Sequence, residues 1–223
     1  MVNVEKWGTT LEELLETLLR AEIEHKAAGR AVWEAYDQVY FPDILVFTVL
    51  KRSMALHSGF RAMLLAENFA CAAPLVRLEL DTSLRMFAAL LFGNVDNFVM
   101  RLAEGQHIRR MKDQTGRLMT DQYLVQRLAE HYPEAPSIYD RYSGDVHLSE
   151  SHLRQAFRLS GDGPDIFEMY ITASDPFVTE AAKIEAARDF LFAAQVLFNI
   201  VADWVTQKRS YRNRNRSGDD TEA

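Results

Sequence analysis

Residues 74–92 read PLVRLELDTSLRMFAALLF, and this stretch decides the fold. Its apolar residues lie on almost every side of a helix: Leu75, Val76, Leu78, Leu80, Leu84, Phe87 and Leu91. A helix that is apolar nearly all round is buried at the centre of a protein. We therefore expect a central helix from about Ala72 to Phe92. Arg77, Asp81 and Arg85 follow one another at four-residue spacing, so they can pair in series along it.

Helical patterns surround this stretch on both sides. Before it, apolar spacing predicts one helix from Leu11 towards Tyr40, with a break at Gly29, and another from about Asp43 to Ala70. After it, a weaker pattern predicts short helices between residues 97 and 131. A last helix begins at Ser174-Asp175-Pro176, which supplies a capping residue and a first-turn proline, and it runs to about Lys208.

These patterns together predict an all-α protein, a helical bundle of about five to seven helices. Alternation on both sides of a Gly-Asp-Gly-Pro turn predicts a small β-hairpin near residues 156–172. Residues 1–208 are expected to form a single helical domain, because a chain of this size can bury one good core. Residues 209–223 carry basic and then acidic side chains without apolar periodicity, so we expect a disordered tail.

The composition limits the classes of function. The net charge of −7 excludes bulk attraction of nucleic acid, so an RNA contact needs a local basic patch, for which Arg109, Arg110 and Lys112 are the candidates. A single cysteine, no signal peptide and no apolar run of about 20 residues favour a cytoplasmic protein that does not enter a membrane. We expect neither metal nor cofactor, because no metal-ligand pattern or glycine-rich phosphate loop occurs.

Polar side chains crowd together in residues 139–147, YDRYSGDVH, where no folding role is evident. Arginine can hold a phosphate with a forked pair of donors, and histidine can transfer a proton near neutral pH. Arg141 and His147 are therefore candidate catalytic residues for metal-independent RNA cleavage that leaves a 2′,3′-cyclic phosphate. Ser143 and Asp145 would orient them. The other histidines are scattered; His25 is expected to be solvated among its charged neighbours, and His57 to lie on a polar helix face.

The spacing Arg141-x5-His147 after long helices resembles the Arg-x(4–6)-His motif of the HEPN superfamily (higher eukaryotes and prokaryotes nucleotide-binding domains). The wider run Tyr139-x3-Ser143-x2-Val146-His147, with LVRLE at residues 75–79 upstream, resembles an uncharacterised family of bacterial helical proteins. The resemblance implies a metal-independent endoribonuclease or RNA-binding protein of a bacterial toxin or phage-defence system. Its site would form across a homodimer, with Arg77 and Glu79 as supporting residues.

Two departures keep an alternative open. A polar residue, often Asn, follows the arginine in catalytic HEPN proteins, whereas Tyr142 follows it here. On an unbroken helix Arg141 and His147 would point about 120° apart, because six residues advance about 600°, although Gly144 could end the helix between them. The alternative is a non-catalytic helical protein that binds a partner protein, with Arg141 and His147 paired to carboxylates. A small-ligand pocket between helices is a third option without a sequence signal of its own.

Overall fold

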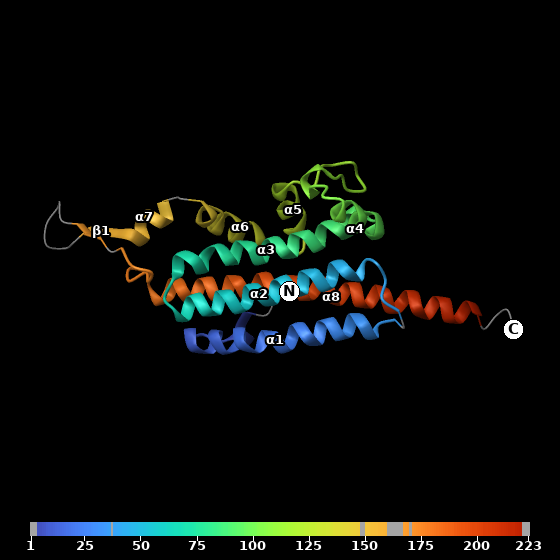
Figure 1. Cartoon of the computed structure of the whole chain (residues 1–223), viewed down its shortest axis with the longest axis horizontal. Helices are drawn as coiled ribbons and strands as arrows, with labels where there is room; N and C mark the ends of the chain where they lie inside the picture. Colours follow the sequence, from blue (N-terminus) through green and yellow to red (C-terminus); the bar gives the residue numbers. More distant parts are fainter. Residues whose placement is uncertain (1–3, 37, 148–149, 160–166, 170, 220–223) are drawn as a thin grey trace.

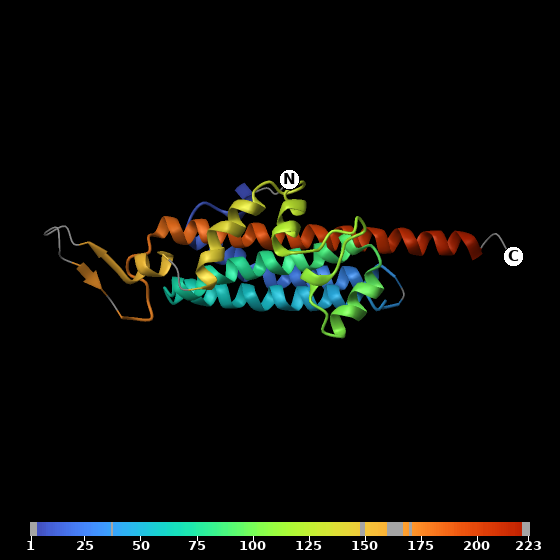
Figure 2. The same ribbon diagram turned by 90° about the horizontal axis from the view of Figure 1, so that it is seen from above.

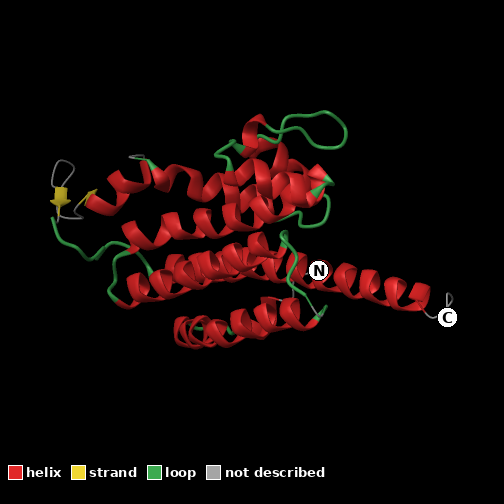
Figure 3. Ribbon diagram, turned by 45° about the vertical axis from the view of Figure 1, so that its right-hand side comes forward, coloured by secondary structure: helices red, strands yellow, loops and turns green. Residues whose placement is uncertain are grey.

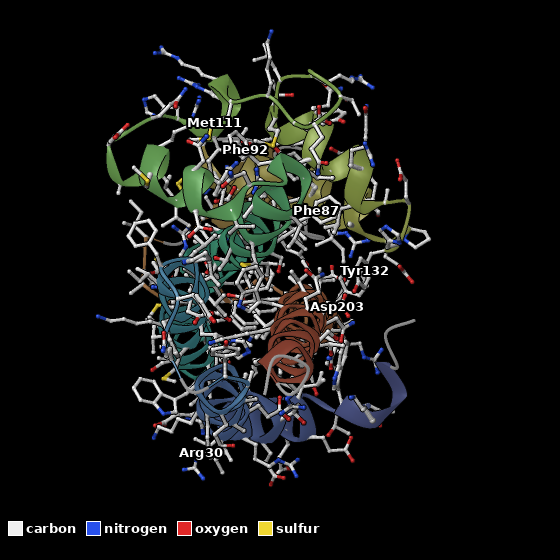
Figure 4. All side chains as sticks on the ribbon, turned by 90° about the vertical axis from the view of Figure 1, so that its right-hand side faces the viewer. Arg30, Phe87, Phe92, Met111, Tyr132 and Asp203 are labelled. Carbon is white, nitrogen blue, oxygen red and sulfur yellow. The ribbon has the colours of Figure 1, made fainter. Side chains whose placement is uncertain are left out.

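The structure of the chain is a computed structural model that describes residues 4–36, 38–147, 150–159, 167–169 and 171–219. Its long helices are α1 (Leu11–Glu34), α2 (Asp43–Leu65), α3 (Phe69–Phe92) and α8 (Glu180–Asp219). These four helices form a bundle in which α1 and α3 lie on opposite sides, and each of them packs along both α2 and α8 (Figures 1 and 4). The prediction of an all-α helical bundle is confirmed.

The helix α3 is the central one, as its sequence predicts. Val76, Leu80 and Leu84 are fully buried, and α3 packs along both α2 and α8. It begins at Phe69, a few residues earlier than expected, because the side chain of Asn68 caps it by accepting a hydrogen bond from the Cys71 amide (3.0 Å). The preceding helix therefore ends at Leu65 rather than Ala70.

The shorter elements cover the outer face of α3 and one end of the bundle. The helices α4, α5 and α6 lie over α3, on the side away from α1 (Figures 1 and 2). The bounds of the short helical elements are η1 (Val4–Trp7), α4 (Val95–Ala103), η2 (Ile108–Arg110), α5 (Asp121–Leu128), α6 (Ala135–Ser143), η3 (Gly144–Val146) and α7 (Glu150–Ala156).

The predicted β-hairpin is present in the described part of the chain. The strands β1 (Phe157–Leu159) and β2 (Phe167–Met169) pair antiparallel, with Arg158 opposite Glu168. Residues 160–166, which carry the predicted turn, lie outside the described residues. Figure 3 shows this hairpin as a small appendage to a helical molecule.

Two further features of the helices differ from the predictions. The helix α1 runs through Gly29 without a break. The helix α8 begins at Glu180 rather than Pro176, because Asp175 instead docks the chain on the α2–α3 turn: its amide donates to the Glu67 oxygen (2.9 Å) and its carboxylate accepts from the Ala70 amide (2.8 Å).

The prediction of a disordered tail over residues 209–223 differs from the structure at the end of α8. The helix continues to Asp219, past residue 208, and projects beyond the bundle (Figure 1). Extending an existing helix costs far less than starting one, and the four arginines of this segment have good helix propensity. The absence of apolar periodicity in this segment therefore did not prevent a helix.

Residues Glu180–Ser210 of α8 are long and apolar enough to cross a membrane by length and composition alone. However, 56% of the most apolar window is buried in the bundle, and Phe190, Ala193 and Leu197 are fully buried. The core helix of a bundle passes the same test, so this is weak support for a membrane span. The expectation of no membrane contact stays a prediction.

Candidate functional site

The candidate catalytic residue Arg141 bridges two helices. Its Nη1 donates to Oε1 of Glu185 (2.5 Å) and to Oδ2 of Asp189 (2.8 Å), both on α8, while the neighbouring Tyr142 hydroxyl donates to the same Asp189 oxygen (3.0 Å). Burial raises the pKa of Asp189, and burial next to Asp189 raises the pKa of Tyr142. Arg141 is thus already neutralised by two carboxylates, which compete with any phosphate.

His147 follows η3, beyond the end of the helix that carries Arg141. The helix α6 ends at Ser143, and η3 carries the chain on to an exposed His147 with extended backbone (φ −125°, ψ 157°). In the described part of the chain, no hydrogen bond or ion pair joins His147 to Arg141. The Ser143 hydroxyl donates to the backbone oxygen of Tyr139 in its own helix (2.5 Å), and Asp145 is half-buried on η3. This geometry supports the alternative in which Arg141 is structural.

Arg77 and Glu79 also fail to meet, because residues two apart on a helix point about 200° apart. The Arg77 guanidinium lies 3.7 Å from the centre of the Tyr139 ring, and it is near Oδ1 of Asp81 (3.7 Å) and Oδ2 of Asp121 (3.9 Å). Its positive charge is therefore balanced on the outer side of α3, towards α5 and α6. Glu79 faces the opposite way, into the core.

The series Arg77, Asp81 and Arg85 forms an ion network wider than the sequence suggests. Arg85 contacts Oδ1 of Asp81 (2.5 Å) and Oδ1 of Asp121 (2.8 Å), so it joins α3 to α5. Arg52 of α2 lies 3.8 Å from Oδ2 of Asp81. The network therefore holds three helices in place through two carboxylates.

This ion network forms one wall of a cleft of about 660 Å³ between α2, α3, the end of α4 and η2. We call it the arginine cleft, after Arg52, Arg85 and Arg109. Its polar lining also includes Asp81 and Asp121, and its apolar lining is Leu45, Val49, Leu102 and Ile108. Arg109 belongs to the basic cluster predicted from the sequence, and Arg110 and Lys112 are exposed beside it. The predicted basic cluster thus lies at the rim of a cleft.

A buried polar chain in the core was missed by the sequence analysis. The Ser53 hydroxyl lies 2.5 Å from Oε1 of Glu79 and 2.8 Å from Nε2 of His25, and all three side chains are buried. Nδ1 of His25 lies 2.6 Å from the Ala21 oxygen. The rings of His25 and His57 meet edge to face, with centroids 4.7 Å apart. The expectations that His25 is solvated and that His57 lies on a polar face are wrong.

The number of protons available fixes the protonation of this hydrogen-bonded group of Ser53, Glu79 and His25. Ser53 has one hydroxyl proton for two short contacts, so the second contact needs a proton from Glu79 or His25. Burial raises the pKa of Glu79 to about 7 and lowers the pKa of His25. The extra proton therefore resides on Glu79, and this group of three side chains is uncharged below about pH 7. Burial, followed by the nearby His25, also lowers the pKa of His57 to about 3.

A periodic signal for the two histidines does exist in the sequence. The buried residues of α1 include Leu14, Leu18, Ala21 and His25, at spacings of four, three and four. The histidine thus continues an apolar stripe, a pattern that outweighs its charged sequence neighbours. The same holds for His57, which lies between Ser53 and Phe60 on the buried face of α2.

No protein-family model, curated protein or solved structure matches the chain. The resemblance to the HEPN superfamily therefore stays a prediction. Within the described ranges, no group of three or more histidine, cysteine, aspartate or glutamate side chains is placed to hold a metal ion. The fold and the site together define an all-helical bundle with an arginine-lined cleft on one face and an uncharged polar chain in its core.

Proposed function

We propose that the protein binds RNA through the arginine cleft and the basic loop at its rim. The observation that carries the proposal is the position of Arg52 and Arg109, which line a cleft of about 660 Å³ in a protein with a net charge of −7. The nearest carboxylate oxygen to Arg52 is 3.8 Å away, and Arg109 has no ion pair in the described part of the chain. Both guanidinium groups therefore have donors to offer to a phosphate.

The loop beside the cleft extends this basic surface. The segment from the last turn of α4 to residue 117 carries five exposed cations: Arg101, Arg109, Arg110, Lys112 and Arg117. The carboxylates in the same segment are Glu104 and Asp113. Asp113 is buried and accepts hydrogen bonds from the Tyr123 hydroxyl (2.5 Å) and the Arg117 amide (2.9 Å). The segment thus presents positive charge on an otherwise acidic protein, which is the local patch that RNA binding requires.

The interior of the cleft suits an unstacked base rather than a duplex. Leu45, Val49 and Ile108 supply an apolar surface, whereas Arg85 is held by Asp81 and Asp121 and so fixes the wall. Proteins that recognise single-stranded RNA combine phosphate contacts at a rim with a surface that takes up exposed bases. A single-stranded segment is therefore the form of RNA that the cleft fits best.

Cleavage by Arg141 and His147 is the other function that the sequence predicts. It requires Arg141 to leave Glu185 and Asp189 and to meet a phosphate together with His147. The contacts of Arg141 favour a structural role instead. Our proposal is therefore RNA binding without cleavage, and a binding assay in EDTA measures both properties at once.

The experiment is fluorescence anisotropy with a labelled single-stranded RNA over a range of salt concentrations, followed by analysis of the RNA ends. We expect saturable binding that weakens with salt, and intact RNA. The double variant Arg109→Ala with Arg110→Ala is expected to bind more weakly and to lower the salt slope by about 0.7 for each phosphate that the variant no longer neutralises.

The matched control is Lys26→Ala with Arg30→Ala, which removes the same charge from α1. Figure 4 shows Arg30 at the opposite side of the molecule from Met111, the residue that follows η2. The control should bind RNA like the wild type. Equal losses in both double variants would mean that net charge alone attracts RNA, and the cleft proposal would then be wrong. Cyclic phosphate ends that disappear in His147→Ala would instead support the ribonuclease prediction.

A further inference from the structure

A smaller cavity of about 210 Å³ lies between η1, α1, α2 and α8 and shares no lining residue with the arginine cleft. Lys6 and Trp7 of η1 line one side of it. The Thr17 hydroxyl donates to the Trp7 oxygen (3.0 Å), and Arg188 of α8 donates to the Gly8 oxygen (3.4 Å). These two hydrogen bonds hold the segment that contains η1 against α1 and α8. The wall of the cavity that this segment forms is therefore held in place by the fold.

His57 lines this cavity and has one nitrogen unpaired. Its Nδ1 lies 3.0 Å from the Ser53 backbone oxygen, and a carbonyl oxygen only accepts, so Nδ1 carries the proton. Nε2 of the neutral ring is therefore an acceptor. It has no hydrogen-bond partner in the described part of the chain, although the residue is only 3% exposed. A buried acceptor without a donor costs free energy, so the site favours an occupant with a hydroxyl or N–H group.

The outer part of the cavity lining is cationic. Lys6 and Arg20 line it, and neither forms an ion pair in the described part of the chain; Nε of Arg20 donates only to the Glu16 backbone oxygen (3.4 Å). Glu24 is the carboxylate among the lining residues. Two cations against one carboxylate favour an anionic group.

The remaining lining is mixed: Thr17 and Gln195 are polar, whereas Trp7, Ala21, Leu191, Ala194 and Phe198 are apolar. Trp7, Leu191 and Phe198 contribute rings and aliphatic carbon, and the volume equals that of about seven water molecules. We propose that this cavity binds a small hydroxylated carboxylate, with the carboxylate at Lys6 and Arg20 and the hydroxyl donating to Nε2 of His57. An aromatic or short aliphatic body would contact Phe198 and Leu191.

The test is isothermal titration of the full-length protein with 3-hydroxybenzoate, benzoate and phenol. These probes differ only in the presence of the hydroxyl or the carboxylate. We expect saturable binding of 3-hydroxybenzoate. Benzoate, which lacks the hydroxyl for His57, and phenol, which lacks the carboxylate for Arg20, should each bind about tenfold more weakly. Absence of saturable heat with 3-hydroxybenzoate would overturn the proposal and leave water as the occupant.

Two variants assign the binding to this cavity. Arg20→Gln changes an exposed side chain and is expected to weaken binding of 3-hydroxybenzoate about tenfold, but not that of phenol. His57→Phe keeps a ring in the core and should abolish the preference for 3-hydroxybenzoate over benzoate. If His57→Phe does not fold, the wild-type comparison of the two probes still decides the hydroxyl contact.

The control Arg109→Ala lies at the arginine cleft and should bind 3-hydroxybenzoate like the wild type. A loss of binding in Arg109→Ala, or an unchanged affinity in Arg20→Gln, would place the ligand elsewhere and contradict the proposal. Because RNA binding is measured separately, a failure of either proposal leaves the other standing.

Discussion

At the scale of single residues, the proton on Glu79 links stability to pH. Its pKa rises from 4.5 to about 7 on folding, so between these values the folded chain holds a proton that the unfolded chain has released. The stability that Glu79 contributes is therefore present below about pH 4.5 and is lost as the pH rises through 7. The pKa of His57 falls from 6.5 to about 3, so its contribution is lost in the opposite direction, as the pH falls from 6.5.

Glu79→Gln separates these two effects. Glutamine resembles the protonated acid at all pH values, so the variant should escape the loss of stability that the wild type undergoes between about pH 4.5 and 7. We expect its free energy of unfolding to exceed that of the wild type by up to about 3 kcal/mol near pH 8 and to be similar near pH 4. Urea denaturation followed by circular dichroism at both pH values measures this. An equal difference at both pH values would show that Glu79 does not titrate between them.

At the scale of helices, the contacts of Arg141 hold α6 against α8. We expect Arg141→Ala to lower the free energy of unfolding by about 1 kcal/mol, because the bridge is partly exposed and water screens it. Asp189→Asn should do the same, and the double variant should lose less than the sum, since the two side chains interact. Denaturation in urea gives all three values.

His147→Ala serves as the comparison for this helix contact. His147 is exposed at the end of η3, so its replacement should change stability by less than about 0.5 kcal/mol. If Arg141→Ala leaves stability unchanged while wild-type RNA cleavage is found and the variant does not cleave, Arg141 is a substrate contact and the catalytic prediction regains support.

At the scale of the whole molecule, a buried ion pair joins segments that are far apart in the sequence. Nζ of Lys208 donates to Oδ2 of Asp43 (2.5 Å) and to the Val32 oxygen (3.0 Å), while Nε1 of Trp204 donates to Oδ1 of Asp43 (2.9 Å). Lys208 and Asp43 are both buried. The end of α1, the start of α2 and the far part of α8 therefore meet at one ion pair, which closes the bundle at this end.

Removing one partner leaves an uncompensated charge in the core. We expect Lys208→Met to lower the free energy of unfolding by about 3–5 kcal/mol. The double variant Lys208→Met with Asp43→Leu should be more stable than Lys208→Met alone, because no buried charge remains. Thermal and urea unfolding test both, and a loss below about 1 kcal/mol in the single variant would contradict a buried pair. A homodimer and a cytoplasmic location stay predictions at this scale.

The sequence by itself determined the helical class, the central position of α3 and the hairpin. These features follow from apolar periodicity, caps and turn residues, which act between residues close in the chain. The position of Arg109, Arg110 and Lys112 on an exposed loop was likewise predictable, because a dense run of charge cannot be buried. Local patterns gave the wrong prediction at His25. Its charged sequence neighbours suggested exposure, although the residue continues the buried face of α1.

Only the tertiary structure decided the roles of the functional candidates. Arg141 meets carboxylates 44 and 48 residues away, Ser53 meets Glu79 26 residues away, and Lys208 meets Asp43 165 residues away. Which faces of two helices meet depends on how their side chains pack, and nearby sequence does not encode that choice. The arginine cleft and the cavity beside His57 arise at such meetings of distant helices, so they appear only once the bundle is assembled.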